Sequence, residues 1–331
     1  MPKTAMLAAV LVLGAMGAPA AAQGSTGPTP PPITSLTVFG DSLVDAGNIL
    51  VTTGGAVPSP RDGYFQGRFT NGYDYTDLLS IALFGTPTVA SLQGGTNFAF
   101  GGARATATSG VPDLTEQLGF FRASLAAGKT VDPTGLYILN FGGNDIFGAL
   151  SDNYPSTYAN DSAFLLDAAR TYAGGVQELS DLGARNIFIT GFPNATPNSA
   201  LLLSLEANGY LQNALGGLSL GDTNVYFYNY LDFFARLQAN PAAFGLPQTI
   251  NFTGNCRAAG AVPNCDNFFS FDGTHPTAAV HQALFRDIQT RFAFAAPVPE
   301  PSTWLMLIVG FAFVGAALRR QRSAKVRVSY S

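Results

Sequence analysis

The two histidines are the most informative residues for chemistry in this sequence of 331 residues, because His275 and His281 are the only imidazoles it contains. Any mechanism that needs an imidazole must use one of them, and a site built from several histidines is disfavoured. His275 follows Asp272 by three residues across a glycine, so the carboxylate can reach one ring nitrogen while the other faces outward. That arrangement orients and charges a general base in a hydrolase triad. The alternative is a surface histidine paired with an acid. His281 is the weaker candidate, because six residues along a helix are about 240° of rotation and place it on another face.

A serine suited to be the matching nucleophile follows the first β-like run of the chain. Ser42 lies in the Gly-Asp-Ser-Leu sequence of residues 40–43, directly after Leu36–Phe39. We expect a helix to follow, so that Ser42 lies at the carboxyl edge of a parallel sheet, where α/β proteins bind ligands. The amides that follow can stabilise negative charge. The competing interpretation is an ordinary helix N-cap, since Asp and Ser are preferred there.

Two further strand ends carry donors that suit an oxyanion. Asn97–Ala103 contains the pair Gly101 and Gly102, whose backbone amides are open to a ligand, and Phe141–Asp145 carries the side-chain amide of Asn144. Donors of both kinds stabilise the negative charge that develops in acyl transfer. Either segment alone could be a tight turn. Three strand ends with complementary chemistry at one sheet edge favour an active site.

A second serine motif competes with Ser42. Residues 217–221 read Gly-Leu-Ser-Leu-Gly and match the nucleophile elbow of α/β-hydrolases, with Asp272 and His275 following in the expected chain order. An elbow requires a strand, a turn and then a helix. Here a helical stretch comes first and the strand-like run Val225–Tyr228 comes after. We therefore interpret the motif around Ser219 as a glycine-rich exit from a helix.

The elements that must position these residues alternate along the chain. Short β-branched or aromatic runs predict strands at 36–39, 97–100, 136–140, 186–190 and 225–228. Longer helical patterns predict helices at 73–81, 114–125, 163–182, 198–215 and 277–292. This alternation predicts one α/β unit with a parallel sheet covered on both faces. The sequence shows no convincing internal repeat or second core.

Four of these blocks, in this order, resemble the GDSL esterases and lipases of the SGNH hydrolase superfamily. They are Gly-Asp-Ser-Leu at 40–43, the Gly102 segment, Gly-Gly-Asn-Asp at 142–145 and Asp-Gly-Thr-His at 272–275. Gly-Arg-Phe-Thr-Asn-Gly at 67–72 and Leu-Gly-Ala-Arg at 182–185 also resemble recurring family segments. The resemblance covers Leu36 to Phe292. It implies an α/β fold, a flavodoxin-like three-layer α/β/α sandwich around about five parallel strands.

The same resemblance implies the roles of the site residues. Ser42 would be the nucleophile, His275 the base and Asp272 its orienting acid, while Gly102, Asn144 and the Ser42 amide would form the oxyanion hole. The implied activity is that of a secreted serine ester hydrolase, which cleaves a small-molecule or lipid carboxylic ester through an acyl-serine intermediate and needs no metal or organic cofactor. Two alternatives are a polysaccharide O-acyl esterase or acyltransferase acting on extracellular carbohydrate, and a noncatalytic surface or matrix protein that retains the fold.

The N-terminus has the layout of a secretory signal peptide. Lys3 precedes the apolar run Ala5–Met16, and the small residues Ala20–Ala22 supply a cleavage site. The alternative, a buried N-terminal helix, is disfavoured by the short run and its cationic start. We therefore predict a signal peptide at 1–22, a Pro-rich spacer at 23–32 and a hydrolase domain at 33–296.

The C-terminal segment, residues 297–331, closely resembles the PEP-CTERM sorting signal of exported bacterial proteins. Pro-Glu-Pro at 299–301 precedes the uncharged run Trp304–Leu318, and five cations follow: Arg319, Arg320, Arg322, Lys325 and Arg327. The uncharged run is shorter than the roughly 20 residues that span a bilayer, but the stretch Ala293–Leu318 has Glu300 as its only charge and allows tilted or interfacial insertion. A core helix is the alternative. The resemblance implies export, transient membrane anchoring through this helix and a sorting protease that removes the tail.

Charge and cysteine content fit an exported protein. The chain has 17 Lys and Arg against 21 Asp and Glu, and this net charge of −4 gives no indication of nucleic-acid binding. Without Lys3 and the five tail cations, residues 23–300 carry −10. Cys256 and Cys265 enclose eight residues, and in an oxidising compartment such a pair most often forms a disulfide. Two free thiols or half of a metal site are the alternatives.

Overall fold

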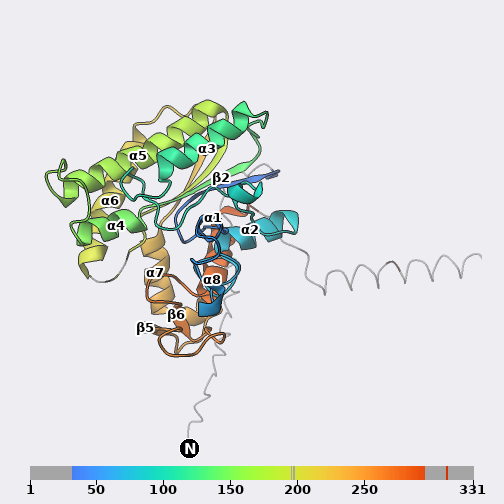
Figure 1. Ribbon diagram of the computed structural model, residues 1–331, viewed down its shortest axis with the longest axis vertical. Coiled ribbons are helices and arrows are strands. Elements are labelled where there is room, and N and C mark those ends of the chain that lie inside the picture. Colours follow the sequence, from blue (N-terminus) through green and yellow to red (C-terminus); the bar gives the residue numbers. More distant parts are fainter. Residues whose placement is uncertain (1–31, 195, 197, 295–310, 312–331) are drawn as a thin grey trace, which may run out of the picture.

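The computed structural model describes residues 32–194, 196, 198–294 and 311 (Figure 1). The predicted signal peptide, all of the spacer but Pro32 and all of the sorting segment but Phe311 lie outside the described residues, so the domain boundaries and the membrane helix stay predictions. Within the described part, no helix is both long enough and apolar enough to cross a membrane.

Four parallel strands form the centre of the fold, in the order β1-β2-β3-β4. They are β1 (Leu36–Gly40), β2 (Leu136–Asn140), β3 (Asn186–Thr190) and β4 (Asn224–Tyr228). The register pairs Leu36 with Leu136. The predicted bounds of these strands differ from the observed ones by no more than one residue. Their common direction places all four carboxyl ends at one edge of the sheet, as the sequence predicts.

The fifth predicted strand, Asn97–Phe100, is not a regular strand. Its backbone still runs parallel to β1, because the N–H groups of Phe98 and Phe100 donate to the carbonyls of Val38 (2.7 Å) and Gly40 (3.1 Å). The pairing is interrupted at Gly40, because its N–H donates to Oε1 of Gln117 (2.9 Å) and not to the carbonyl of Phe98. The sheet therefore has four regular strands rather than about five, and an irregular segment fills the fifth position.

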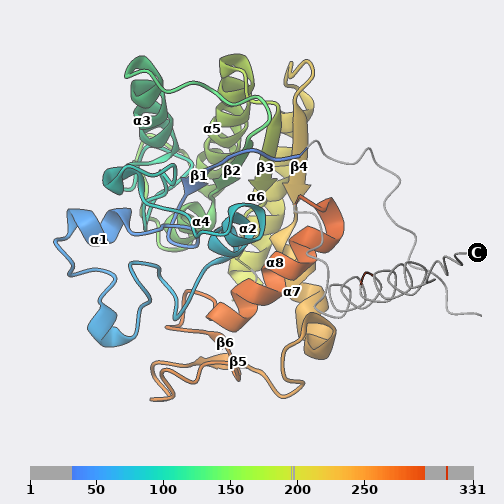
Figure 2. The same ribbon diagram turned by 90° about the vertical axis from the view of Figure 1, so that its right-hand side faces the viewer.

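Alternate strand side chains pack into two cores on opposite faces of the sheet, because successive residues of a strand point to opposite sides. Tyr137 and Leu139 contribute to one core, and Leu136 and Ile138 to the other. The first face is covered by α3 (Leu114–Ala126), α5 (Asp161–Leu182) and α6 (Asn198–Gly216). The second face is covered by α2 (Tyr75–Phe84), α7 (Tyr230–Ala239) and α8 (Ala278–Phe292). Figures 1 and 2 show these helices on the two sides of the strands, which is the expected three-layer sandwich.

Several short elements were not predicted. They include α1 (Asn48–Thr52), α4 (Gly143–Leu150), α7 and the 3-10 helices Pro60–Asp62, Ser91–Gln93 and Pro241–Phe244. The five predicted helices match observed ones to within three residues at each end. Two of these elements lie at candidate site segments, because α1 begins five residues after Leu43 and α4 contains Asn144.

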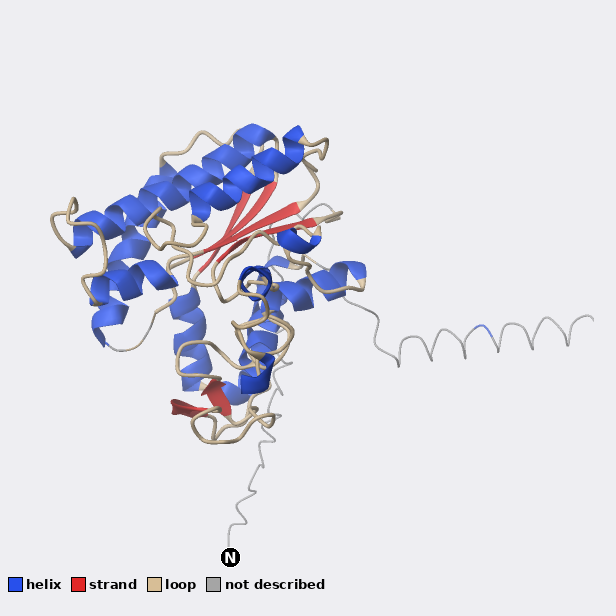
Figure 3. Cartoon of the chain, in the orientation of Figure 1, coloured by secondary structure: helices blue, strands red, loops and turns tan. Residues whose placement is uncertain are grey.

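A two-stranded sheet lies apart from the main one, as Figure 3 shows. It pairs β5 (Asn251–Asn255) with β6 (Phe268–Ser270), and the loop between them contains the disulfide Cys256–Cys265. Both cysteines are buried with Phe271 in a small third core. The sequence-based expectation of a disulfide is confirmed, and this substructure leads directly into Asp272.

Candidate active site

Three side chains from distant parts of the sequence form one hydrogen-bonded chain. Nε2 of His275 lies 2.8 Å from Oγ of Ser42, and Nδ1 of His275 lies 2.7 Å from Oδ2 of Asp272. Ser42 follows β1, whereas Asp272 and His275 lie in the loop between β6 and α8. In this geometry the base reaches the serine through one ring nitrogen and the acid through the other, which is the arrangement of a hydrolase triad.

The position of Ser42 depends on a tight turn that follows β1. Asp41 fixes this turn, because its Oδ1 accepts the N–H of Leu43 (3.0 Å) and its backbone carbonyl accepts the N–H of Val44 (3.2 Å). Gly40 is required before the turn, since a Cβ there would lie 2.5 Å from Cγ2 of Val44. Helix α1 begins only at Asn48. The expected helix therefore does not start at Ser42, and the N-cap interpretation is wrong.

The loop that carries the base is held together by its own acid. Oδ1 of Asp272 accepts the N–H groups of Thr274 (2.9 Å) and His275 (2.8 Å), so the carboxylate closes the turn that it shares with the imidazole. The side chains of Asp272 and His275 are only 9% and 12% exposed. Burial alone would raise the pKa of Asp272, but the hydrogen bonds and charge of His275 outweigh it and hold that pKa well below its ordinary value. Asp272 therefore stays ionised at neutral pH.

The segment at 67–72 fastens this loop to the rest of the molecule. Oγ1 of Thr70 donates to the carbonyl of Pro276 (2.7 Å), and Oδ1 of Asn71 accepts the N–H of Ala278 (2.9 Å). The ring of Phe69 lies 5.2 Å from that of His275. Sequence reasoning noted the segment without giving it a role. The structure shows that it holds the loop and the ring of His275.

Of the two glycines, Gly102 is the one that can serve an oxyanion. The N–H of Gly101 already donates to Oδ2 of Asp45 (2.9 Å). Gly102 is exposed, with φ at +89°, and its N–H has no hydrogen-bond acceptor among the described residues. The same holds, within the described part of the chain, for the N–H of Ser42. Asn144 lies beside this loop, since its Nδ2 donates to the carbonyl of Ala103 (2.9 Å). One N–H of this amide is thus engaged, and the second is left to donate to an oxyanion.

Two buried aspartates that sequence reasoning did not single out brace the Gly102 loop. Asp45 accepts the N–H groups of Gly47, Asn48 and Ile49 as well as that of Gly101. Asp145 accepts the N–H groups of Ala105 and Thr106 on the other side of the loop. Burial raises the pKa of each aspartate to about 6. The sequence signal for them was proximity: Asp145 is in the same block as Asn144, and Asp45 follows Ser42 by three residues.

The structure leaves two weaker candidates outside this arrangement. His281 is buried in α8, and its pKa falls to about 3, first because of burial and second because of the charge of His275. Ser219 is exposed in the connection from α6 to β4, and its N–H donates to Gln177. The motif at 217–221 therefore does lie between a helix and a strand, as predicted, and not in an elbow.

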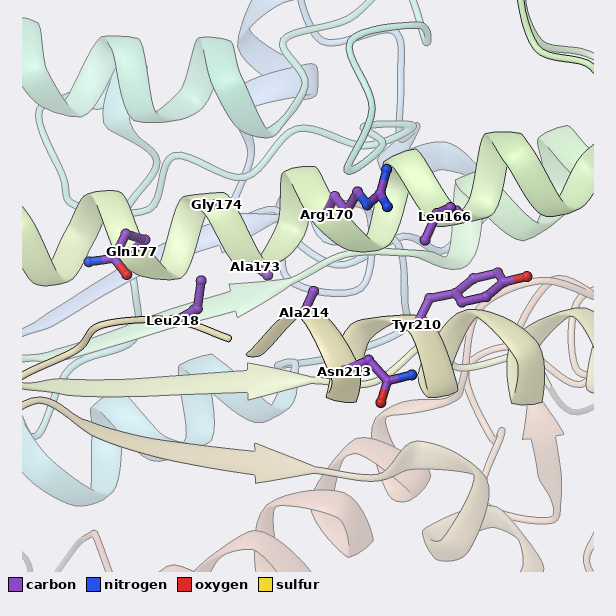
Figure 4. A pocket seen from close by; sticks show the side chains of 9 residues that line it. All are labelled: Leu166, Arg170, Ala173, Gly174, Gln177, Tyr210, Asn213, Ala214 and Leu218. Carbon is purple, nitrogen blue, oxygen red and sulfur yellow. The ribbon is translucent and has the colours of Figure 1, made fainter. Parts of the chain in front are cut away.

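A hollow of about 540 Å³ lies elsewhere, between α5 and α6 (Figure 4). Its polar lining includes Arg170, Gln177 and Tyr210. None of the five candidate site residues lines this hollow, so it is separate from the candidate active site.

Comparison with known proteins gives two family models that match the chain. The family model of GDSL-like lipases and acylhydrolases matches residues 36–288, and the PEP-CTERM protein-sorting motif matches residues 297–322. Acetylajmalan esterase 2 of Rauvolfia serpentina is 28% identical, with 76% of this chain and 88% of that protein covered. The thermolabile hemolysin of Vibrio parahaemolyticus is 25% identical over 76% of this chain, which spans 62% of the hemolysin.

A solved structure also resembles the chain, although weakly. It is a family two carbohydrate esterase from Clostridium thermocellum in complex with cellohexaose, with 17% identity and a TM-score of 0.40. The match covers 80% of this chain and 66% of that one. A likeness at this level carries no argument about substrate.

Proposed function

The chain belongs to the family of GDSL-like lipases and acylhydrolases and is a carboxylic ester hydrolase, and from this premise we propose that Ser42 is its nucleophile, with His275 as general base and Asp272 as the acid that orients it. One observation carries the proposal: the unbroken chain of contacts from Oγ of Ser42 through both nitrogens of His275 to Asp272. These linked contacts favour a catalytic role, because a noncatalytic protein would not require them.

In the first half-reaction, Nε2 of His275 takes the proton of Ser42 while Oγ bonds to the ester carbonyl carbon. The carbonyl oxygen becomes an oxyanion, for which the N–H groups of Gly102 and Ser42 and the amide of Asn144 are the donors. Asp272 stays ionised and stabilises the imidazolium that forms. The imidazolium then gives its proton to the leaving alkoxide oxygen, the ester C–O bond breaks, and an acyl-serine remains.

Water completes the cycle by the same route. Nε2 of His275 removes a proton from water as its oxygen attacks the acyl carbon, and the oxyanion forms again in the same place. When the C–Oγ bond breaks, the imidazolium returns a proton to Ser42, and the carboxylic acid leaves. Every proton is moved by His275, so no metal or organic cofactor enters this scheme.

The test is hydrolysis of a short-chain nitrophenyl ester by two serine variants. Ser42→Ala removes the attacking oxygen, and we expect hydrolysis to fall to background. Ser219→Ala is the matched control, because it changes the serine of the competing motif in an exposed connection; it should keep most of the parent's activity. The opposite pattern would overturn the assignment of the nucleophile.

The PEP-CTERM motif supports export and sorting of the protein to the cell surface. We further propose that residues 1–22 are a signal peptide, that residues 33–296 are the hydrolase domain, and that the helix within 297–331 anchors the chain in the membrane until a sorting protease removes it. Intact-mass measurement of the protein released by its own host tests this. The released form should begin at Gln23 and lack the Arg-rich tail, whereas a released form that keeps the tail would contradict removal.

A further inference from the structure

The carboxylate of Asp272 has a partner on the side away from the serine. The phenol of Tyr64 donates to Oδ2 of Asp272 at 2.7 Å, and this is the same oxygen that faces Nδ1 of His275. Oδ1 is already occupied by two backbone N–H groups. Both oxygens of the acid are thus held in place, and Tyr64 supplies the contact that fixes the oxygen facing the base.

Tyr64 is set up to remain a donor. Burial raises its pKa to about 12, and the hydrogen bond to Asp272 acts in the same direction. Its ring is held at its edges by Phe271 (5.0 Å between centroids) and Phe69 (6.2 Å). Phe69 also contacts the ring of His275, so one of the two rings that pack against Tyr64 packs against the imidazole as well.

The positively charged side chain of Arg257 contacts the phenol of Tyr64. Nη1 of Arg257 donates to the oxygen of Tyr64 at 3.1 Å, and the guanidinium carbon lies 5.0 Å from the centre of the ring. A phenol that accepts a hydrogen bond from a cation is polarised and becomes a stronger donor. Nη2 of Arg257 also forms a solvent-exposed ion pair with Oδ1 of Asp62 at 3.5 Å. Its positive charge therefore reaches Asp272 through Tyr64.

The disulfide loop ties Arg257 to the acid. Cys256 and Arg257 donate their N–H groups to the carbonyls of Ser270 (3.0 Å) and Phe271 (2.9 Å), the two residues before Asp272. The bridge from Cys256 to Cys265 closes this loop. Arg257 and Asp272 are therefore parts of one small substructure, joined by backbone hydrogen bonds as well as through Tyr64.

We propose that Tyr64 and Arg257 are positioning residues for the ester hydrolysis, extending the chain Ser42–His275–Asp272 by two members. The proposal rests on the catalytic roles proposed above. Tyr64 holds Asp272 at the rotation that aims Oδ2 at His275, and Arg257 strengthens that hold. Neither touches the substrate. Their loss should therefore lower kcat and leave KM nearly unchanged.

The test begins with Tyr64→Phe, which removes the hydroxyl and keeps the ring that packs against Phe271. A hydrogen bond to a charged acceptor is worth enough that kcat should fall about tenfold to a hundredfold, with KM within about twofold. Tyr158→Phe is the matched control, because Tyr158 also donates to an aspartate, Asp167, at 2.6 Å but lies outside this substructure. That variant should keep the parent's kcat.

The role of Arg257 is tested by a double-mutant cycle. Arg257→Met alone should lower kcat, and Arg257→Lys, which keeps a charge and a donor, should restore part of the loss. Because Arg257 acts through the phenol, Arg257→Met should cost little more in the Tyr64→Phe background than Tyr64→Phe costs alone. Additive losses in kcat would overturn the proposed path from the cation to the acid. Thermal unfolding of each variant identifies losses that come from misfolding.

The outcomes distinguish this proposal from the proposed function. If Tyr64→Phe folds and keeps kcat within twofold of the parent while Ser42→Ala is inactive, the positioning proposal fails and the serine mechanism stands. If Tyr64→Phe does not fold, the same test is applied to Arg257→Met: a folded variant that keeps kcat within twofold of the parent overturns the positioning proposal. If Ser42→Ala remains active, the proposed mechanism itself fails.

Discussion

Replacing Asn144 with alanine should separate catalysis from folding. If the Asn144 amide donates to the oxyanion, its loss should lower kcat by about 100-fold to 1000-fold, which is about 2.7–4 kcal/mol of transition-state stabilisation. KM should change little, because the charge it stabilises is absent from the bound substrate.

The effect on folding should be much smaller. Among the described residues, the Asn144 side chain makes one hydrogen bond, to the carbonyl of Ala103 at 2.9 Å. Losing such a bond costs about 0.5–1.5 kcal/mol, and alanine recovers part of this through its higher helix propensity within α4. Asp145 continues to hold the Gly102 loop through Ala105 and Thr106.

The assay compares kcat, KM and thermal unfolding for three variants on a nitrophenyl ester. Asn144→Asp keeps the size of the side chain but removes the donor and adds a charge that repels the oxyanion, so it should be at least as inactive as Asn144→Ala. Asn153→Ala, at an exposed position just after α4, is the control and should match the parent. A folded Asn144→Ala variant with kcat within tenfold of the parent would refute the oxyanion role.

Two further predictions concern stability. Burial raises the pKa of Asp41 to about 7, above its ordinary value, so the folded state binds this proton more tightly than the unfolded chain does. The stabilisation is complete below about pH 4 and is lost as the pH rises to about 7. The unfolding free energy of the parent, relative to that of Asp41→Asn, should therefore fall over that range by up to about 4 kcal/mol. Urea titrations in which the two proteins show the same pH dependence would contradict this. Replacing Cys256 and Cys265 together with serine should lower the unfolding free energy by about 2–3 kcal/mol, because the unfolded chain gains conformational entropy when the short loop is no longer closed. An unchanged urea midpoint and slope would show that the disulfide does not stabilise the fold.

The central strands could be predicted because a fully buried parallel strand leaves a simple pattern. All five residues of β3 (Asn186–Thr190) are buried, and the run is rich in β-branched and aromatic side chains. The segment Asn97–Phe100 has a similar composition, but the side chain of Gln117 takes the Gly40 N–H that a regular strand there would bond, and composition does not encode this contact. Helix α7 begins two residues after β4 ends, and its Tyr and Phe residues read as a continuation of the strand.

The candidate site residues could be placed in the fold for a topological reason. Parallel strands bring their carboxyl ends to one edge, so Ser42 and Asn144 could be placed near each other without knowledge of any side-chain contact. Tyr64 could not be placed in this way. It lies in an irregular stretch, 208 residues from the aspartate that it contacts, and only the folded disulfide loop brings Arg257 to it. Contacts of this kind depend on loop packing, which has no periodic signature.

The most direct measurement is covalent labelling with a fluorophosphonate, followed by peptide mass spectrometry. An activated serine oxygen bonds to phosphorus and displaces fluoride, so the adduct marks the nucleophile itself. The proposed mechanism predicts one adduct, on the peptide that contains Ser42, and its disappearance in both Ser42→Ala and His275→Ala. An adduct on Ser219, or equal labelling after His275→Ala, would contradict it.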